Sequence, residues 1–220
     1  MNIKLDAVEV RILGCLIEKE LTTPDYYPLT LNALINACNQ KSNRNPVVEY
    51  DETTVEQALV NLRKRALVML VRGAGIRVSK FRHYIKDELK LALPEMVLLA
   101  VLMLRGPQTI GELRGRTERM YDFKDLDEVE QTLAGLMTDD RRYVTKLPRQ
   151  VGHKENRFAH LLSGEPVFST IEDDATEGSV TSEDTALTAR IEKLEATVET
   201  MNTEMNALKQ AFEKFKSQFE

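Results

Sequence analysis

Residues 41–80 carry the side chains whose chemistry best suggests a function. Lysine and arginine neutralise nucleic-acid phosphates, and asparagine and glutamine amides can pair bidentately with adenine. The predicted phosphate contacts are Lys41, Arg44, Arg63, Lys64, Arg65, Arg72, Arg77 and Lys80. The predicted base contacts are Thr54, Gln57, Asn61 and again Lys64, spaced as one face of a helix. This pattern predicts a surface for double-stranded DNA.

Acidic residues in the same stretch leave a second interpretation open. Asp51, Glu52 and Glu56 stand in the half of the predicted helix that usually meets DNA, where carboxylates repel phosphates. Without DNA, the cations would serve as charge at a helix C-terminus and as solubilising groups on a hairpin. The alternative is a non-enzymatic protein-interaction or scaffold protein, whose partner the sequence does not identify.

Residues with catalytic or metal-binding potential are sparse. The three histidines, His83, His153 and His160, have no third ligand at a recognisable spacing, and no phosphate loop of the Walker type occurs. Cys15 and Cys38 stand at apolar positions of predicted helices, which favours two small buried side chains over a disulfide or a reactive thiol. We expect no enzyme activity, no metal and no cofactor.

An internal repeat indicates how these residues are positioned. Residues 55–62 read VEQALVNL and residues 129–136 read VEQTLAGL, with five of eight positions identical. Each copy belongs to a predicted third helix and is followed by two short β-like runs. Such a helix–helix–helix–hairpin unit is typical of a winged helix, in which the third helix enters the major groove. The repeat therefore predicts two tandem winged-helix domains.

The hydrophobic periodicity places the elements of both units. The first domain, residues 1–84, has predicted helices at 6–20, 30–39 and 51–66 and β-like runs at 67–71 and 76–81; the second, residues 85–162, has helices at 94–104, 109–118 and 125–138 and β-like runs at 143–147 and 157–162. Capping boxes are predicted at Asp6/Glu9, Thr53/Glu56 and Thr109/Glu112, and inward positions of the last helix at Leu126, Val129, Leu133 and Leu136. The predicted class is mainly α with small β-hairpins (α+β).

The C-terminal segment has a different pattern. Residues 163–186 contain no lysine or arginine and are predicted to be a flexible acidic linker. Apolar residues then alternate at spacings of four and three: Leu187, Ile191, Leu194, Val198, Met201, Met205, Leu208, Phe212, Phe215 and Phe219. A 3.5-residue repeat of this length predicts a coiled coil over residues 187–220. Complementary pairs such as Arg190 with Glu195 favour a parallel homodimer, and a lone helix folded back on the body is the alternative.

Charge and hydropathy limit the other function classes. The net charge of −5 comes from +3 in residues 1–84, zero in residues 85–162 and −8 in residues 163–220. Only the first domain leans basic, so any phosphate-binding surface must be local. No apolar run reaches the ~20 residues of a membrane span, and the N-terminus lacks the apolar core of a signal peptide. We expect a cytoplasmic protein that does not enter the membrane.

Residues 5–162 resemble a known bacterial family. The runs LIEKE at 16–20, TTP at 22–24, YPLTLN at 27–32, ACNQKSNR at 37–44, ELR at 112–114, RMY at 119–121 and DEVE at 127–130 are similar to the YceH-like proteins. The resemblance implies a tandem winged-helix fold and no known role, so it transfers no catalytic residue. The predicted third helix, its hairpin and the local cations, and not this resemblance, give the expected function: a dimeric DNA-binding protein or transcriptional regulator, with the scaffold role as the alternative.

The loop from Asn39 to Arg44 belongs to this resemblance and has two interpretations. It is unusually rich in amides and contains two cations, which suits a binding loop. Its amides could instead cap the preceding helix and the start of the following segment.

Overall fold

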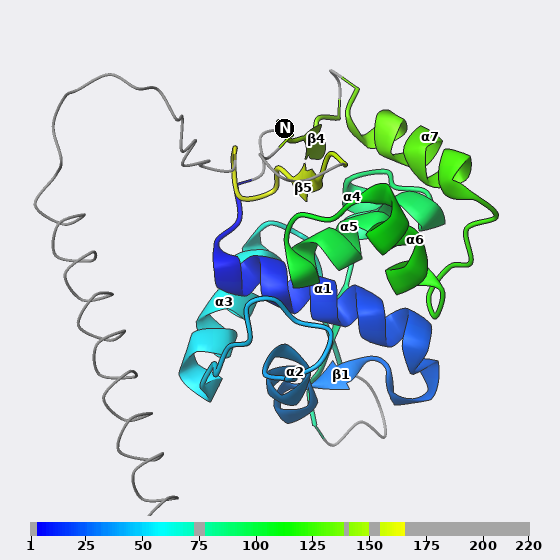
Figure 1. Ribbon diagram of the computed structural model, residues 1–220. Coiled ribbons are helices and arrows are strands. Elements are labelled where there is room, and N and C mark those ends of the chain that lie inside the picture. The colour runs from blue at the N-terminus through cyan, green and yellow to red at the C-terminus, as the bar shows by residue number, and fades with distance from the viewer. Residues whose placement is uncertain (1–3, 73–77, 139–140, 150–154, 166–220) are drawn as a thin grey trace, which may run out of the picture. The chain divides into compact units, whose positions relative to one another are not determined.

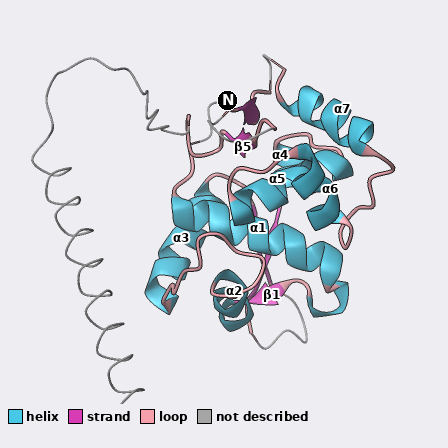
Figure 2. Ribbon diagram, viewed as in Figure 1, coloured by secondary structure: helices cyan, strands magenta, loops and turns pink. Residues whose placement is uncertain are grey.

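The protein is a mixed α/β molecule in which helices predominate and the strands are short and antiparallel (Figure 2). The computed structural model describes residues 4–72, 78–138, 141–149 and 155–165. The predicted linker from residue 166 onward and the whole predicted coiled coil, Leu187 to Phe219, lie outside the described residues. The α+β class is confirmed by the described elements.

The described residues of the first half form three α-helices and a small sheet. Its elements are α1 (Ala7–Thr22), a 3-10 turn (Pro24–Tyr26), β1 (Leu29–Thr30), α2 (Leu31–Cys38), α3 (Glu52–Lys64), β2 (Val68–Val71) and β3 (Lys80–His83). The strand order is β1-β3-β2, with Leu29 opposite Phe81 and Val68 opposite His83. The three predicted helices are therefore present, and the short strand β1 adds to the expected hairpin.

The second half repeats the plan of helices followed by a hairpin. Its elements are α4 (Ile85–Glu88), α5 (Leu93–Arg105), α6 (Ile110–Thr117), α7 (Leu126–Leu136), β4 (Val144–Lys146) and β5 (Phe158–His160). Strands β4 and β5 pair antiparallel, with Val144 opposite His160. The short helix α4 precedes the three helices that the sequence pattern predicted for this half.

Two of the three predicted capping boxes are confirmed. Asp6 Oδ1 accepts from the Glu9 amide at 2.8 Å while Glu9 Oε2 accepts from the Asp6 amide at 2.9 Å. Thr109 and Glu112 make the same reciprocal pair at 3.2 and 2.9 Å. The prediction for Thr53 is wrong: helix α3 begins earlier, and Asp51 is its N-cap, with Oδ1 accepting from the amide of Thr54 at 2.7 Å. Because α3 already includes Glu52, the capping position falls on Asp51, two residues before Thr53.

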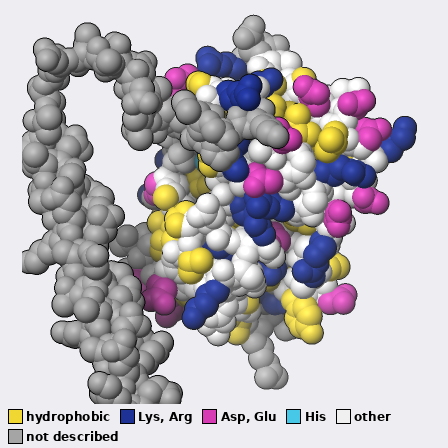
Figure 3. Space-filling view, in the orientation of Figure 1, with side chains coloured by type: hydrophobic (Ala, Val, Ile, Leu, Met, Phe, Trp, Pro, Cys, Tyr) yellow, Lys and Arg dark blue, Asp and Glu magenta, His cyan; other side chains and the backbone are white. Residues whose placement is uncertain are grey.

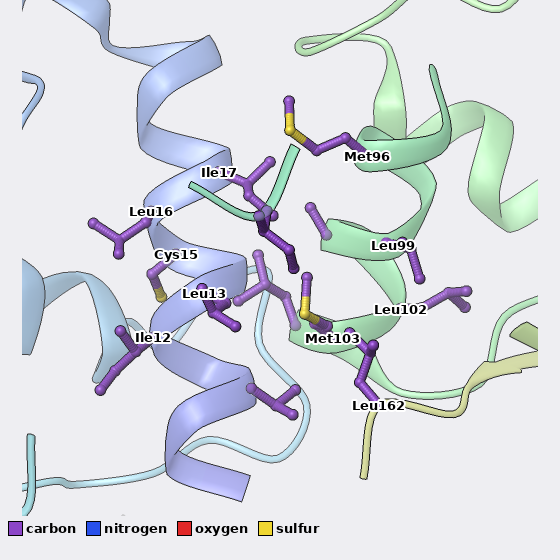
Figure 4. Packing of buried hydrophobic residues seen from close by; sticks show 14 of the residues in the cluster. Ile12, Leu13, Cys15, Leu16, Ile17, Met96, Leu99, Leu102, Met103 and Leu162 are labelled. Atoms are coloured by element: carbon purple, nitrogen blue, oxygen red, sulfur yellow. The ribbon is translucent and has the colours of Figure 1, made fainter. Parts of the chain in front are cut away.

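Helix α1 is the centre of the hydrophobic core. It contacts α2 and α3 on one side and α5 on the other (Figure 1). Figure 4 shows Leu13 and Ile17 pointing toward α5, from which Met96 and Met103 point back. Ile12, Cys15 and Leu16 point the other way, toward the first half. A helix that is apolar over most of its circumference must be buried on both sides, and residues 9–17 of α1 are all buried.

The core therefore joins the two halves, because one cluster of buried side chains runs through α1 and α5. Residues 1–168 group as one compact unit. The division into domains 1–84 and 85–162 depends on the sequence repeat and stays a prediction. Cys15 and Cys38 are free and fully buried within this core, as expected. The hydrogen bond with the neighbouring Cys15 and then burial raise the pKa of the Cys38 thiol, so it stays protonated.

Candidate nucleic-acid interface

Helix α3 has a buried stripe and a polar exposed face. Val55, Ala58, Leu59 and Leu62 are buried, because they recur every three or four residues against α1 and α2. On the opposite face, Gln57, Asn61 and Lys64 are exposed. Three of the four predicted base contacts therefore share one solvent-facing stripe. Val60 lies beside them and is 46% exposed, an exposure that its apolar character alone did not indicate.

The fourth predicted base contact is less accessible. Thr54 is half-buried near the start of α3, where its amide and side chain bond to Asp51. These hydrogen bonds lower the pKa of the Asp51 carboxyl, which is therefore ionised near neutral pH. With exposed Glu52 and Glu56, this carboxylate makes the N-terminal end of α3 acidic. A polyanion would be repelled there and attracted toward the other end.

The C-terminal end of α3 is basic. Arg63 and Lys64 are exposed, and neither makes an ion pair within the part of the chain that is described. Arg65 is the C-cap residue; its guanidinium donates to the carbonyl of Lys4 at 2.5 Å and lies 3.6 Å from Glu9 Oε2. The sequence prediction treated the three as equivalent, whereas Arg65 also ties the N-terminal segment to α3.

The hairpin after α3 carries further cations. Arg72, which follows β2, is exposed, and Lys80 at the start of β3 is half-buried. Arg82 is exposed on β3 and adds a cation that the predicted contacts did not include. Arg77 lies outside the described residues. Lys41 is exposed in the loop after α2. On the face seen in Figure 3, basic and acidic side chains are interspersed.

Arg44 does not lie at this surface. Its side chain is fully buried and forms a bidentate pair with Glu18 of α1, at 3.1 and 2.6 Å. The same guanidinium donates to the carbonyl of Ala37 and to Gln40 Oε1. A cation whose donors are all directed into the protein has none left for a phosphate. We therefore remove Arg44 from the set of nucleic-acid contacts.

The loop from Asn39 to Arg44 is held by side chains of the protein itself. The Asn39 amide donates to the Tyr50 carbonyl at 2.9 Å and accepts from the Tyr50 amide at 2.8 Å. Asn39 thus acts as the capping interpretation expected, closing the loop that leads into α3. Arg105 of α5 donates to Asn43 Oδ1, which connects the same loop to the second half.

The second half presents a different surface. Val129, Leu133 and Leu136 of α7 are buried as predicted, but Leu126 is 49% exposed, so its inward assignment is wrong. Leu126 is the first residue of α7, and the buried residues of this helix belong to its later turns. Asp127 and Glu130 are exposed on the same helix. This helix is therefore a poor match for a polyanion.

The arginines of α6 are partly engaged. Arg114 donates to the carbonyls of Phe123 and Lys124, at 3.2 and 3.1 Å. Arg116 lies 3.4 Å from Glu112 Oε1. Arg114 thus fixes the loop that leads into α7, whereas Arg116 makes only a long contact.

The histidines serve structural roles where they are described. His83 Nε2 lies 2.7 Å from Glu20 Oε2, and this hydrogen bond lowers the pKa of the Glu20 carboxyl. His160 of β5 is half-buried, and desolvation of its ring lowers its pKa to about 4 and keeps it neutral near pH 7. His153 lies outside the described residues. Within residues 4–72, 78–138, 141–149 and 155–165, no three potential ligands gather around a common point, and no helix is long and apolar enough to cross a membrane.

Comparison with known proteins places the chain in a family. A family model described as "Protein of unknown function, DUF480" matches residues 5–153. The chain is 51% identical over 220 residues to a UPF0502 protein of Geotalea uraniireducens (strain Rf4), and the match covers all of both chains. A UPF0502 protein of Geobacter sulfurreducens is 50% identical over 220 residues, again across both whole chains.

A third relative matches over about three quarters of each chain. The UPF0502 protein of Opitutus terrae is 53% identical over 169 residues, which are 76% of this chain and 74% of the relative. The resemblance seen in the sequence to a bacterial family of unknown role is confirmed by these matches. The first of these UPF0502 relatives is similar to the chain along its whole length. The chain therefore belongs to the DUF480 family of uncharacterised bacterial proteins.

Proposed function

We propose that this protein binds double-stranded DNA through the exposed face of α3 and the β2–β3 hairpin, and that it acts as a transcriptional regulator. The observation that carries the proposal is the stripe Gln57, Asn61 and Lys64, which is exposed on a helix packed firmly by its other face. With its side chains an α-helix is ~10–12 Å across, which fits the ~12 Å width of the major groove.

The order of elements supports a winged-helix architecture for the first half. The chain runs α1, β1, α2, α3, β2, β3, and the strands form one antiparallel sheet in the order β1-β3-β2. In such an arrangement the third helix reads the groove while the hairpin touches the backbone. The proposal extends the winged helix to the second half, in which α5, α6 and α7 precede the β4–β5 hairpin.

The charge distribution along α3 sets the direction of approach. Glu52 and Glu56 disfavour contact with phosphates at the N-terminal end, whereas Arg63 and Lys64 favour it at the other. Arg72 and Arg82 on the hairpin extend the basic region. DNA would therefore be bound by the C-terminal half of α3 and by the hairpin, with Gln57 and Asn61 reading base edges between them.

Residues 187–220 are proposed to make the protein a homodimer through a parallel coiled coil. The support is the unbroken heptad pattern of the sequence. Two copies of the first half would then bind two half-sites. Sedimentation of the full chain and of a Leu194→Asp, Leu208→Asp variant tests this: the wild type should have twice the mass of the variant, and equal monomer masses would refute it.

Fluorescence anisotropy with a labelled mixed-sequence duplex tests the DNA proposal. Affinity should fall steeply as salt rises, with a slope of about 0.9 per phosphate contact on logarithmic axes. Arg72→Ala should weaken binding about equally for different duplexes, because a phosphate contact carries no sequence information. The absence of binding at low salt would rule out the proposal.

A second candidate function has its own support in the other half. Exposed Leu126 stands beside Asp127 and Glu130 on α7, a combination of an apolar and an acidic surface that suits a basic protein partner better than DNA. The protein would then be a non-enzymatic scaffold that assembles through its second half and the C-terminal helix. A partner lost on Leu126→Asp but kept on Arg72→Ala would favour this function.

A further inference from the structure

A polar cavity of about 380 Å³ lies away from α3 and its hairpin. Its walls come from the C-terminal end of α1, the loop after α2, the end of α5 and the last turn of α6 with the residues that follow. It therefore opens where the first and second halves meet. Small-molecule sites commonly occupy such junctions, and this volume falls within the ~300–1,000 Å³ usual for them.

Four cations line the cavity: Lys19, Arg105, Arg116 and Arg119. Arg119 is exposed and makes no hydrogen bond or ion pair within the described part of the chain. Arg105 has an asparagine, Asn43, and no carboxylate as its side-chain partner. Lys19 makes long contacts, of 3.5 Å to Glu18 and 3.4 Å to Gln40 Oε1, and Arg116 lies 3.4 Å from Glu112. None of the four is strongly paired.

The acidic residues of the cavity do not balance these cations. Both carboxylate oxygens of Glu18 accept hydrogen bonds from the buried Arg44. Glu118 is exposed to solvent. The unbalanced charge also acts on Arg105: burial, and then the nearby Arg116 and Arg44, lower the pKa of its guanidinium. Positive charges held together with fewer counterions than cations are destabilised until an anion joins them.

The cavity is also firmly built, because its walls belong to ordered parts of both halves. The Arg44–Glu18 pair and the two hydrogen bonds between Asn39 and Tyr50 fix the loop that carries Gln40, Ser42 and Asn43. Val101 and Leu104 of the rigid core form its floor. A site that is already ordered loses little conformational entropy when a ligand binds.

We propose that this cavity binds a small phosphorylated molecule, with Arg105, Arg116 and Arg119 holding the phosphate group and Lys19 supplying a further charge. Guanidinium groups match the tetrahedral oxygens of phosphate through bidentate hydrogen bonds, and several cations suit its double charge better than that of a carboxylate. Ser42 is exposed at the rim and can donate its hydroxyl to the remainder of the molecule. The ligand would contact both halves, and this inference does not depend on DNA binding.

Isothermal titration of the full chain with inorganic pyrophosphate tests the proposal. The wild type should give saturable binding, and Arg119→Gln and Arg116→Gln should each weaken it at least about tenfold, since each removes charge-assisted hydrogen bonds to the phosphate. The matched control is Arg82→Gln, which removes the same charge from exposed β3 outside the cavity. It should bind pyrophosphate within about twofold of the wild type.

Two outcomes would overturn the proposal. One is the absence of saturable binding at millimolar pyrophosphate, and the other is an equal loss in the Arg82→Gln control, which would indicate general ionic attraction. A DNA duplex separates the two sources of phosphate. If Arg119→Gln weakens duplex binding and pyrophosphate does not bind, the cavity contacts a nucleic-acid backbone and the small-molecule proposal is wrong. Pyrophosphate binding by a protein that binds no DNA would retain this site while refuting the DNA proposal.

Discussion

Gly14 of α1 lies directly against Leu104 of α5. A Cβ atom at Gly14 would come within 2.9 Å of both Cγ and Cδ2 of Leu104 and within 3.3 Å of Met103 Cβ. No Cβ atom is accommodated at such distances without movement of a neighbour, and Cγ is held by the buried core. The absence of a side chain at this one position therefore permits the close approach of the two helices that joins the halves.

Gly14→Ala should destabilise the protein by about 1–2 kcal/mol. Overpacking a core typically costs ~1–3 kcal/mol, and the gain of up to ~1 kcal/mol in helix propensity offsets only part of it. The control is Gly111→Ala in α6, where an added Cβ would meet no atom within 4 Å. Urea unfolding should show that this control is unchanged or stabilised by up to ~1 kcal/mol. A stabilised Gly14→Ala protein would contradict the packing described for α1 and α5.

Arg44→Met should destabilise the protein by about 3–5 kcal/mol, because it leaves the largely buried Glu18 carboxylate without its counterion. Arg44→Lys should not restore stability, since an ammonium group cannot reproduce the bidentate pair and the bonds to Ala37 and Gln40. Chemical denaturation measures both variants.

Arg63→Met is the matched control for Arg44. Its side chain is exposed and unpaired within the described residues, so its loss should change stability by no more than ~0.5 kcal/mol. An equally mild effect of Arg44→Met would mean that its buried pair is not needed, and would return Arg44 to the list of surface contacts.

His160 should make the protein sensitive to mild acid. Its Nδ1 atom is buried with no hydrogen-bond partner among the described residues, and burial lowers its pKa from 6.5 to about 4. The unfolded chain therefore binds this proton at higher pH than the folded chain. Stability is at its full value above about pH 6.5 and falls as the pH decreases toward 4, with roughly 2 kcal/mol lost between about pH 7 and pH 5.

His160→Gln removes the titrating group and should flatten this part of the profile. Free energies of unfolding of the two proteins at about pH 7 and pH 5 give the comparison. The difference between the two pH values should be smaller in the variant by most of that ~2 kcal/mol. An identical decrease in both proteins would show that His160 does not carry the effect.

The helices were predictable from the sequence because their signals are local. The pair Asp6 and Glu9 marks the start of α1 within four residues, and the apolar period marks its length. The strand β1 was not predictable in the same way, because it is two residues long and exists only through pairing of Leu29 with Phe81. This strand forms because of a tertiary contact, and the β-propensity of its two residues does not reveal it.

The candidate site was predictable only where the helical spacing of apolar residues shows which side chains are exposed. Gln57, Asn61 and Lys64 are exposed because the opposite stripe of α3 is apolar, and that pattern is visible in the sequence. Arg44 was misplaced because its partner Glu18 lies 26 residues earlier on another helix. The cavity at the junction of the halves could not be foreseen, since it brings Lys19 and Arg119 together from segments that no local pattern connects.

The most direct test of DNA binding compares two charge-reversed proteins of equal net charge. One is Arg63→Glu with Lys64→Glu at the end of α3, and the other is Lys124→Glu with Lys146→Glu, both exposed in the second half. Duplex affinity is measured for each by fluorescence anisotropy over a range of salt concentrations. We predict that the α3 variant loses at least about tenfold in affinity and about two units of salt slope, while the second-half variant stays within about threefold of the wild type. Equal losses in the two variants, or no duplex binding by the wild type, would contradict the account.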